Sequence, residues 1–157
     1  MDAFKASEVF EVAVQIEQNG EKLYRHAVNV TDDPKMKDVF NYLAEEEVKH
    51  RGLFEALAEK VEHYQPPEAY PGEYCSYVRA YAEGIVFSPE KMEQELAKIK
   101  SAGDAVEMGI QREIESILYY LEIKSFVPKN QWEDVDRIIE EERTHYLRLV
   151  DLKRDLT

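Results

Sequence analysis

Hydrophobic residues recur along four long stretches of the chain at the spacing of one helix face. Within each stretch they follow an i, i+3, i+4 pattern, which predicts an amphipathic helix. The expected helices cover residues 7–30, 34–63, 101–127 and 130–155. The apolar positions predicted to face inward are Phe10, Ala13, Val14, Ala27, Met36, Phe40, Leu43, Phe54, Leu57, Val61, Val106, Ile110, Ile117, Val135, Ile138, Leu149 and Leu152.

Residues that favour helix starts precede these stretches. A short polar side chain at the N-cap can accept a hydrogen bond from the first turn, and an acid three residues later can return one to the cap. Proline suits the first helical position. The candidate start signals are Ser7, Asp33 followed by Pro34, Ser101 with Asp104, and Asn130 with Glu133.

The connections between the four stretches differ in length. Residues 31–34 and 127–130 are short links, which join antiparallel neighbours. The third connection, residues 64–100, is long and contains two shorter helical patterns, at about Ser76–Glu83 and from Pro89 to about Lys100.

These links predict an all-α fold in which two antiparallel helical hairpins form a four-helix bundle. A long crossover with short helices would join the hairpins. We expect one domain over residues 1–157, with hairpins at about 7–63 and 101–155 and the crossover at about 64–100.

Ionisable residues interrupt the centre of each apolar face. The pattern occurs twice: a lone glutamate in the first helix of a hairpin has a tyrosine seven residues later, and the second helix carries Glu-x-x-His. The candidate metal ligands are Glu17, Glu47, His50, Glu113, Glu142 and His145, and the tyrosines are Tyr24 and Tyr120.

Hairpin geometry predicts that these residues meet. The midpoint between Glu17 and Glu47 falls in the first short link, and the midpoint between Glu113 and Glu142 falls in the second. Residues equally far from a tight turn lie level on antiparallel helices, and a histidine at i+3 shares the face of its glutamate. Pairing the hairpins would therefore bring four carboxylates and two imidazoles into one bundle interior.

Such a cluster needs compensating positive charge. Four buried carboxylates would otherwise protonate or open the bundle, and no Lys or Arg lies on the four apolar faces. Two divalent cations would cancel the four charges and accept the two imidazoles. Oxygen and imidazole ligands without sulfur suit iron or manganese better than structural zinc, although zinc could substitute.

Composition excludes several other classes of function. With 20 basic and 33 acidic residues, the formal net charge is −13, which repels nucleic acid and anionic membranes. The lone Cys75 rules out an intrachain disulfide, a CxxC motif and a thiolate-rich zinc site. Neither a signal peptide nor a membrane-length apolar run is evident, so we expect a cytoplasmic protein.

The polar repeat resembles the ferritin-like superfamily, and most closely the rubrerythrin-type di-iron carboxylate proteins. The segments that carry this resemblance are IEQNGEKLY (16–24), LAEEEVKH (43–50), QREIESILYY (111–120) and IIEEERTH (138–145). It implies a ferritin-like bundle with two iron ions per chain that react with hydrogen peroxide or dioxygen, in a homodimer or higher oligomer.

The resemblance also implies a role for each ligand. Glu47 and Glu142 match bridging carboxylates, Glu17 and Glu113 match terminal ones, and His50 and His145 each match a ligand of one metal. Two departures stand out. The family's additional glutamate, three residues after Glu113, is Ser116 here, and the four-cysteine rubredoxin module is absent from this sequence. Electrons would therefore come from an external donor, such as a rubredoxin-like protein.

The leading interpretation is a non-haem di-iron oxidoreductase that reduces hydrogen peroxide or dioxygen. One alternative is a protein that binds or oxidises iron without peroxidase turnover, and another is a structural bundle whose metal site is inactive. Tyr24 and Tyr120 either hydrogen-bond a carboxylate ligand or only fill the core.

The remaining charged residues near the motifs are expected at the surface. His26 and His63 lie on faces opposite to the ligands. Glu45, Glu46, Glu140 and Glu141 would form a solvated face, although one of them could orient a ligand histidine.

Overall fold

The computed structural model describes residues 5–64 and 72–157. Within these ranges the chain is helical and has no strand. Its α-helices are α1 (Ala6–Val28), α2 (Pro34–Lys60), α3 (Gly72–Ile85), α4 (Pro89–Lys98), α5 (Ala102–Ile123) and α6 (Trp132–Leu156). Two short 3₁₀ segments, Lys124–Phe126 and Lys129–Gln131, link α5 to α6. The predicted all-α fold is confirmed.

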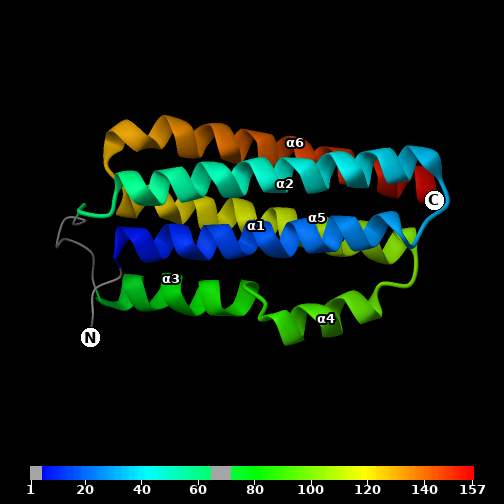
Figure 1. Cartoon of the computed structure of the whole chain (residues 1–157), viewed down its shortest axis with the longest axis horizontal. Helices are drawn as coiled ribbons and strands as arrows, with labels where there is room; N and C mark the ends of the chain where they lie inside the picture. The colour runs from blue at the N-terminus through cyan, green and yellow to red at the C-terminus, as the bar shows by residue number, and fades with distance from the viewer. Residues whose placement is uncertain (1–4, 65–71) are drawn as a thin grey trace.

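The bundle consists of the hairpins α1–α2 and α5–α6, with α1 beside α5 and α2 beside α6 (Figure 1). The helices of each neighbouring pair run in opposite directions. Ion pairs join both ends of α2 and α6 in this antiparallel arrangement, since Lys35 meets Asp155 and Lys60 lies 4.0 Å from Asp134.

The crossover lies along one side of the bundle, next to α1 and α5 and away from α2 and α6 (Figure 1). Its two helices run from the end of the bundle where α2 ends to the end where α5 begins. The α3 helix is longer than the sequence pattern predicted, and α4 ends two residues early. Residues 65–71 of the predicted crossover lie outside the described residues.

Two of the four predicted helix starts are confirmed. The Asp33 carboxylate accepts a hydrogen bond from the Met36 backbone N–H at 3.2 Å, and Pro34 occupies the first helical position. Ser101 and Asp104 form the predicted capping box, with bonds of 3.1 and 3.0 Å.

The starts predicted at Ser7 and Asn130 are wrong. The first helix begins at Ala6, because the backbone N–H of Lys5 donates to the Glu8 carboxylate at 2.9 Å and makes Lys5 the cap. Asn130 lies in a 3₁₀ segment before α6. The Trp132 indole N–H donates to the Lys124 carbonyl at 2.9 Å, so an aromatic anchor fixes this helix start.

Helix ends also differ from the pattern by a few residues. The predicted second helix continued to about His63, whereas α2 ends at Lys60 and Val61 caps it. The predicted third helix continued to the residue before Pro128, whereas α5 ends at Ile123 and tightens into a 3₁₀ turn. Tightening of the last turn is common where terminal carbonyls lack partners.

The interior has two apolar clusters separated by a polar layer. One contains Phe10, Phe54 and Ile138, and the other contains Phe40, Leu43 and Leu149. Along each of the four bundle helices, the polar positions fall between the residues of these clusters. Hydrophobic packing on both sides therefore holds the polar residues at fixed heights.

No helix within the described part of the chain combines the length and apolar character needed to cross a bilayer.

Replacing Asp33 by alanine removes the N-cap acceptor of α2. We expect the free energy of unfolding to fall by about 1 kcal/mol, measured by urea denaturation with a chelator present. Asp32→Ala is the matched control, because it removes the same charge from the exposed neighbouring position. Equal losses in both variants would assign the effect to charge near the helix end rather than to the cap.

Candidate metal centre

The polar layer brings together all six residues that the sequence selected as candidate ligands. Glu17 comes from α1, Glu47 and His50 from α2, Glu113 from α5, and Glu142 and His145 from α6. Each has no more than 5% of its surface exposed. Charged side chains are almost never so deeply buried unless they are paired or bind a metal.

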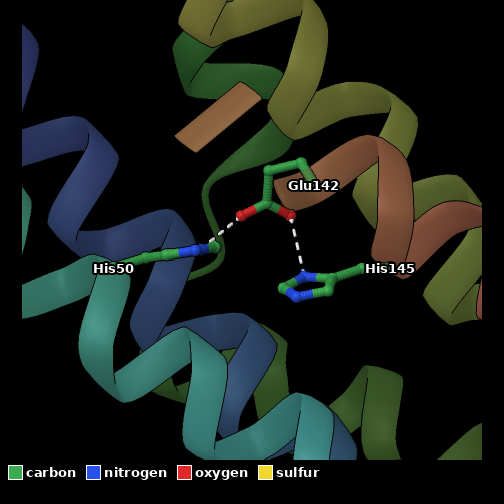
Figure 2. Close-up of side chains that lie close together, drawn as sticks. All are labelled: His50, Glu142 and His145. Carbon is green, nitrogen blue, oxygen red and sulfur yellow. Dashed lines mark ion pairs between the residues drawn. The ribbon is translucent and has the colours of Figure 1, made fainter. Parts of the chain in front are cut away.

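Glu142 lies between the two imidazoles, and each of its oxygens faces a different ring (Figure 2). Its Oε1 is 2.6 Å from His50 Nδ1, and its Oε2 is 3.5 Å from His145 Nδ1. The two rings stack at 5.4 Å between centroids. A carboxylate placed between two imidazoles in this way could bind two metal ions, one beside each ring.

Each imidazole also has a second carboxylate nearby. His50 Nδ1 lies 3.6 Å from Glu17 Oε2, and His145 Nδ1 lies 4.0 Å from Glu113 Oε1. Two groups of residues can each offer ligand atoms that all lie within 4.8 Å of one another. One group is Glu47, Glu113, Glu142 and His145, and the other is His50, Glu142 and His145. Glu142 and His145 belong to both groups, so the six residues form one continuous cluster. The distances to Glu17 and Glu113 divide it into a half with Glu17 and His50 and a half with Glu113 and His145.

Several buried atoms of this cluster lack a hydrogen-bond partner among the described residues. They are Glu17 Oε2, His50 Nδ1, Glu113 Oε2, Glu142 Oε1, His145 Nδ1 and His145 Nε2. His50 Nδ1 and Glu142 Oε1 are close together, yet the approach does not have hydrogen-bond geometry. Buried polar atoms are normally satisfied, so these unsatisfied carboxylate and imidazole atoms fit metal ligands.

The protonation energetics of the cluster lead to the same interpretation. Burial, together with the adjacent carboxylates, raises the pKa of Glu47 and of Glu113 well above the usual value. For Glu142 burial acts in the same direction, but the adjacent Glu113 carboxyl and the two nearby imidazoles lower its pKa. Burial opposes charge on His50, yet Glu142 and Glu17 raise its pKa to about 11. Without a metal, protons must supply the missing positive charge.

Tyr24 and Tyr120 hydrogen-bond the carboxylates across the bundle. Tyr24 on α1 donates to Glu113 on α5, and Tyr120 on α5 donates to Glu17 on α1. Burial and these carboxylates raise the pKa of both tyrosines well above the usual value, so both remain protonated donors. Each tyrosine thus donates to the glutamate of the other hairpin. The sequence pattern showed only that each tyrosine follows a glutamate of its own helix by seven residues.

Gly20 leaves the space that the Glu47 carboxylate occupies. A Cβ atom at this position would lie 2.8 Å from Glu47 Cδ, closer than carbon atoms can approach. A glycine within a helix costs stability, and here it permits a carboxylate of α2 to lie against the backbone of α1.

Glu141 contacts the site, which is the alternative that the sequence left open for one of the four glutamates expected on the solvated face. Its Oε2 lies 2.7 Å from His50 Nε2. No spacing along the chain reveals this contact, because Glu141 and His50 come from different hairpins. Glu45 and Glu140 are exposed as expected, whereas Glu46 is half-buried and pairs with Lys49.

The structure also places Ser116, His63 and His26, which the sequence had singled out. Ser116, where the resemblance implies a glutamate, donates to the carbonyl of Arg112 in its own helix at 2.8 Å. His63 is exposed as expected. The surface position expected for His26 is wrong, since its ring is half-buried with Nε2 3.4 Å from the carbonyl of Ile99, where the crossover meets α1.

Gly20→Ala should weaken metal binding, because the new methyl group displaces the Glu47 carboxylate. A chelator-competition titration with Zn²⁺ would measure the loss. Gly52→Ala on α2 is the control, since no described atom lies within 4 Å of its new Cβ. That control should bind metal normally and gain up to about 1 kcal/mol of stability from helix propensity.

Tyr24→Phe and Tyr120→Phe should each lower metal affinity by about 10–100-fold, because a carboxylate ligand loses the donor that orients it. The same titration measures this effect. Tyr119→Phe is the control, since the Tyr119 hydroxyl donates to the Val9 carbonyl at 3.0 Å, outside the polar layer. An equal loss of affinity in all three variants would mean that the tyrosines act only by packing.

Comparisons with known proteins agree with this geometry. The rubrerythrin family model matches residues 8–153. The crystal structure of a Thermotoga maritima protein described as a ferritin-like diiron-carboxylate protein superposes with a TM-score of 0.73 and 24% sequence identity, over 100% of this chain and 99% of that chain. A comparison with curated proteins finds no match. The chain has a ferritin-like fold and belongs to the rubrerythrin family.

Proposed function

We propose that this protein is a non-haem di-iron oxidoreductase that reduces hydrogen peroxide or dioxygen with electrons from an external donor. The observation that carries the proposal is the set of buried carboxylate and imidazole atoms that lack partners among the described residues. Membership in the rubrerythrin family supports iron as the metal.

Two iron ions per chain would be held by the two halves of the cluster. Glu17 and His50 would bind one ion, and Glu113 and His145 the other. Glu142 would bridge them, with Glu47 as the second bridging carboxylate. The four carboxylates would balance the charge of two divalent ions, so the buried layer would become neutral. Manganese or zinc could occupy the same ligands.

Bound iron would supply the redox chemistry, in which two electrons and two protons convert hydrogen peroxide into two molecules of water, or dioxygen into hydrogen peroxide. The chain itself would fix the ligands and limit the access of water. The apolar clusters on both sides would lower the local dielectric constant, and Tyr24 and Tyr120 would hold the two terminal carboxylates. A donor protein, such as a rubredoxin-like one, and a homodimeric assembly remain predictions.

The first test is metal content after anaerobic purification, followed by a hydrogen peroxide titration of the ferrous protein. We expect about two irons per chain, as in related bundles, with near-ultraviolet absorbance that rises on oxidation and falls under reductant. Repeated turnover with an electron donor supports the oxidoreductase. One stoichiometric oxidation would favour iron binding instead, and no response after ferrous reconstitution would contradict both.

Glu47→Gln should weaken metal binding but stabilise the metal-free protein. It should abolish binding of the metal pair and peroxide turnover, because a bridging carboxylate is lost. It should also raise the thermal midpoint of the metal-free protein, since burial opposes charge at this position. Glu45→Gln is the control on the same helix, where the side chain is exposed and neither quantity should change. Full turnover in Glu47→Gln would contradict the assignment.

A further inference from the structure

The two imidazoles of the cluster differ at the nitrogen that points away from Glu142. His50 Nε2 lies 2.7 Å from the Glu141 carboxylate. His145 Nε2 is buried and lacks any hydrogen-bond partner within residues 5–64 and 72–157. The ring of Tyr42 meets the His145 ring at 90°, with centroids 5.9 Å apart, and so contributes packing to this side. The two halves of a cluster built from a repeated motif are therefore not equivalent.

The origin of this difference lies in the two copies of the motif, EEEVKH (45–50) and EEERTH (140–145). Glu46 and Glu141 occupy equivalent positions, but the residues three positions later are Lys49 and Thr144. Lys49 forms an ion pair with Glu46. The Thr144 hydroxyl instead donates to the Glu140 carbonyl of its own helix at 3.2 Å. Glu46 also lies near His50 and Glu141, with ligand atoms of the three residues within 4.8 Å of one another. Because Glu46 pairs with Lys49, Glu141 is the carboxylate that contacts His50 Nε2.

A carboxylate only accepts hydrogen bonds, so Glu141 requires the proton of His50 to be on Nε2. Nδ1, which faces Glu17 and Glu142, is then the atom available to a metal. A carboxylate that accepts from a ligand histidine also orients the ring and raises the basicity of the metal-binding nitrogen. His145 receives no such support from the described residues.

We propose that Glu141 is a positioning residue that makes the metal position beside His50 bind more tightly than the position beside His145. The proposal rests on the proposed two-metal centre. On stepwise loading, the position of Glu17 and His50 would fill first. The position of Glu113 and His145 would fill second and exchange its metal more readily.

The test is a titration of the metal-free protein with Co²⁺, followed by absorbance and by competition with a chelator. We expect two steps of different affinity in the unaltered protein. Glu141→Ala should weaken the tighter step by about 10–100-fold and leave the weaker step in place. Glu140→Ala is the matched control, because it removes the same charge one residue away, from an exposed side chain that pairs with Arg143. It should bind like the unaltered protein.

A second readout identifies the histidine. In the Zn²⁺-loaded protein, the Nε2–H proton of His50 should give a downfield ¹H NMR signal that exchanges slowly with water. Glu141→Ala should lose or shift this signal, whereas Glu140→Ala should retain it. Glu141→Ala leaves a buried imidazole N–H without its acceptor, so the thermal midpoint of the metal-free protein should fall modestly in this variant and stay the same in Glu140→Ala. A single cooperative unfolding transition in both variants checks that each remains folded.

Binding by Glu141→Ala that matches the unaltered protein, or equal weakening of both steps, would overturn the proposal.

These outcomes are distinct from failure of the proposed function. Co²⁺ and Zn²⁺ binding needs neither oxidant nor electron donor. Two binding steps of equal affinity in the unaltered protein would contradict the proposed difference between the two metal positions, but not the proposed di-iron oxidoreductase. An unaltered protein that binds no metal would contradict both proposals.

Discussion

The structure depends on one electrostatic constraint, which is that four carboxylates share a buried layer in the middle of a helical bundle. Their mutual repulsion and loss of hydration are costly, and no lysine or arginine side chain from the described residues enters the layer to offset them. Only protons or metal ions can supply the charge. The upward pKa shifts of Glu47 and Glu113 show how the protein responds without a metal.

The rest of the fold keeps this unfavourable layer in place. Apolar clusters on either side, built around Phe10 and Phe54 at one end and Phe40 and Leu149 at the other, provide the burial that stabilises the bundle. The short links keep the glutamates of each hairpin level. Gly20 lowers the stability of the α1 helix but leaves the space that the Glu47 carboxylate occupies. The same arrangement links stability to function, since the residues proposed to bind metal destabilise the protein when no metal is bound.

The sequence predicted the helices, the two hairpins and the height of each polar residue, because these follow from periodicity and loop position within one hairpin. It predicted that the candidate ligands of the two hairpins meet, but not which individual side chains contact one another between the hairpins. The Tyr120–Glu17 pair and the Glu141–His50 contact depend on how two hairpins face each other, which no spacing along the chain encodes. The start of α6 was missed for a similar reason, since Trp132 is anchored by carbonyls at the end of α5 rather than by a polar cap.

The crossed tyrosines also set an order of events during synthesis. Glu17 leaves the ribosome early, whereas its hydrogen-bond donor, Tyr120, is 103 residues further along the chain. The first hairpin therefore emerges with only half of the buried cluster and without the hydrogen-bond donor of Glu17. Domains fold largely as units once their sequence is available, so the complete cluster forms only after synthesis has passed His145. In the proposed di-iron centre, the paired metal site would therefore be assembled after both hairpins are made, rather than on the first hairpin alone.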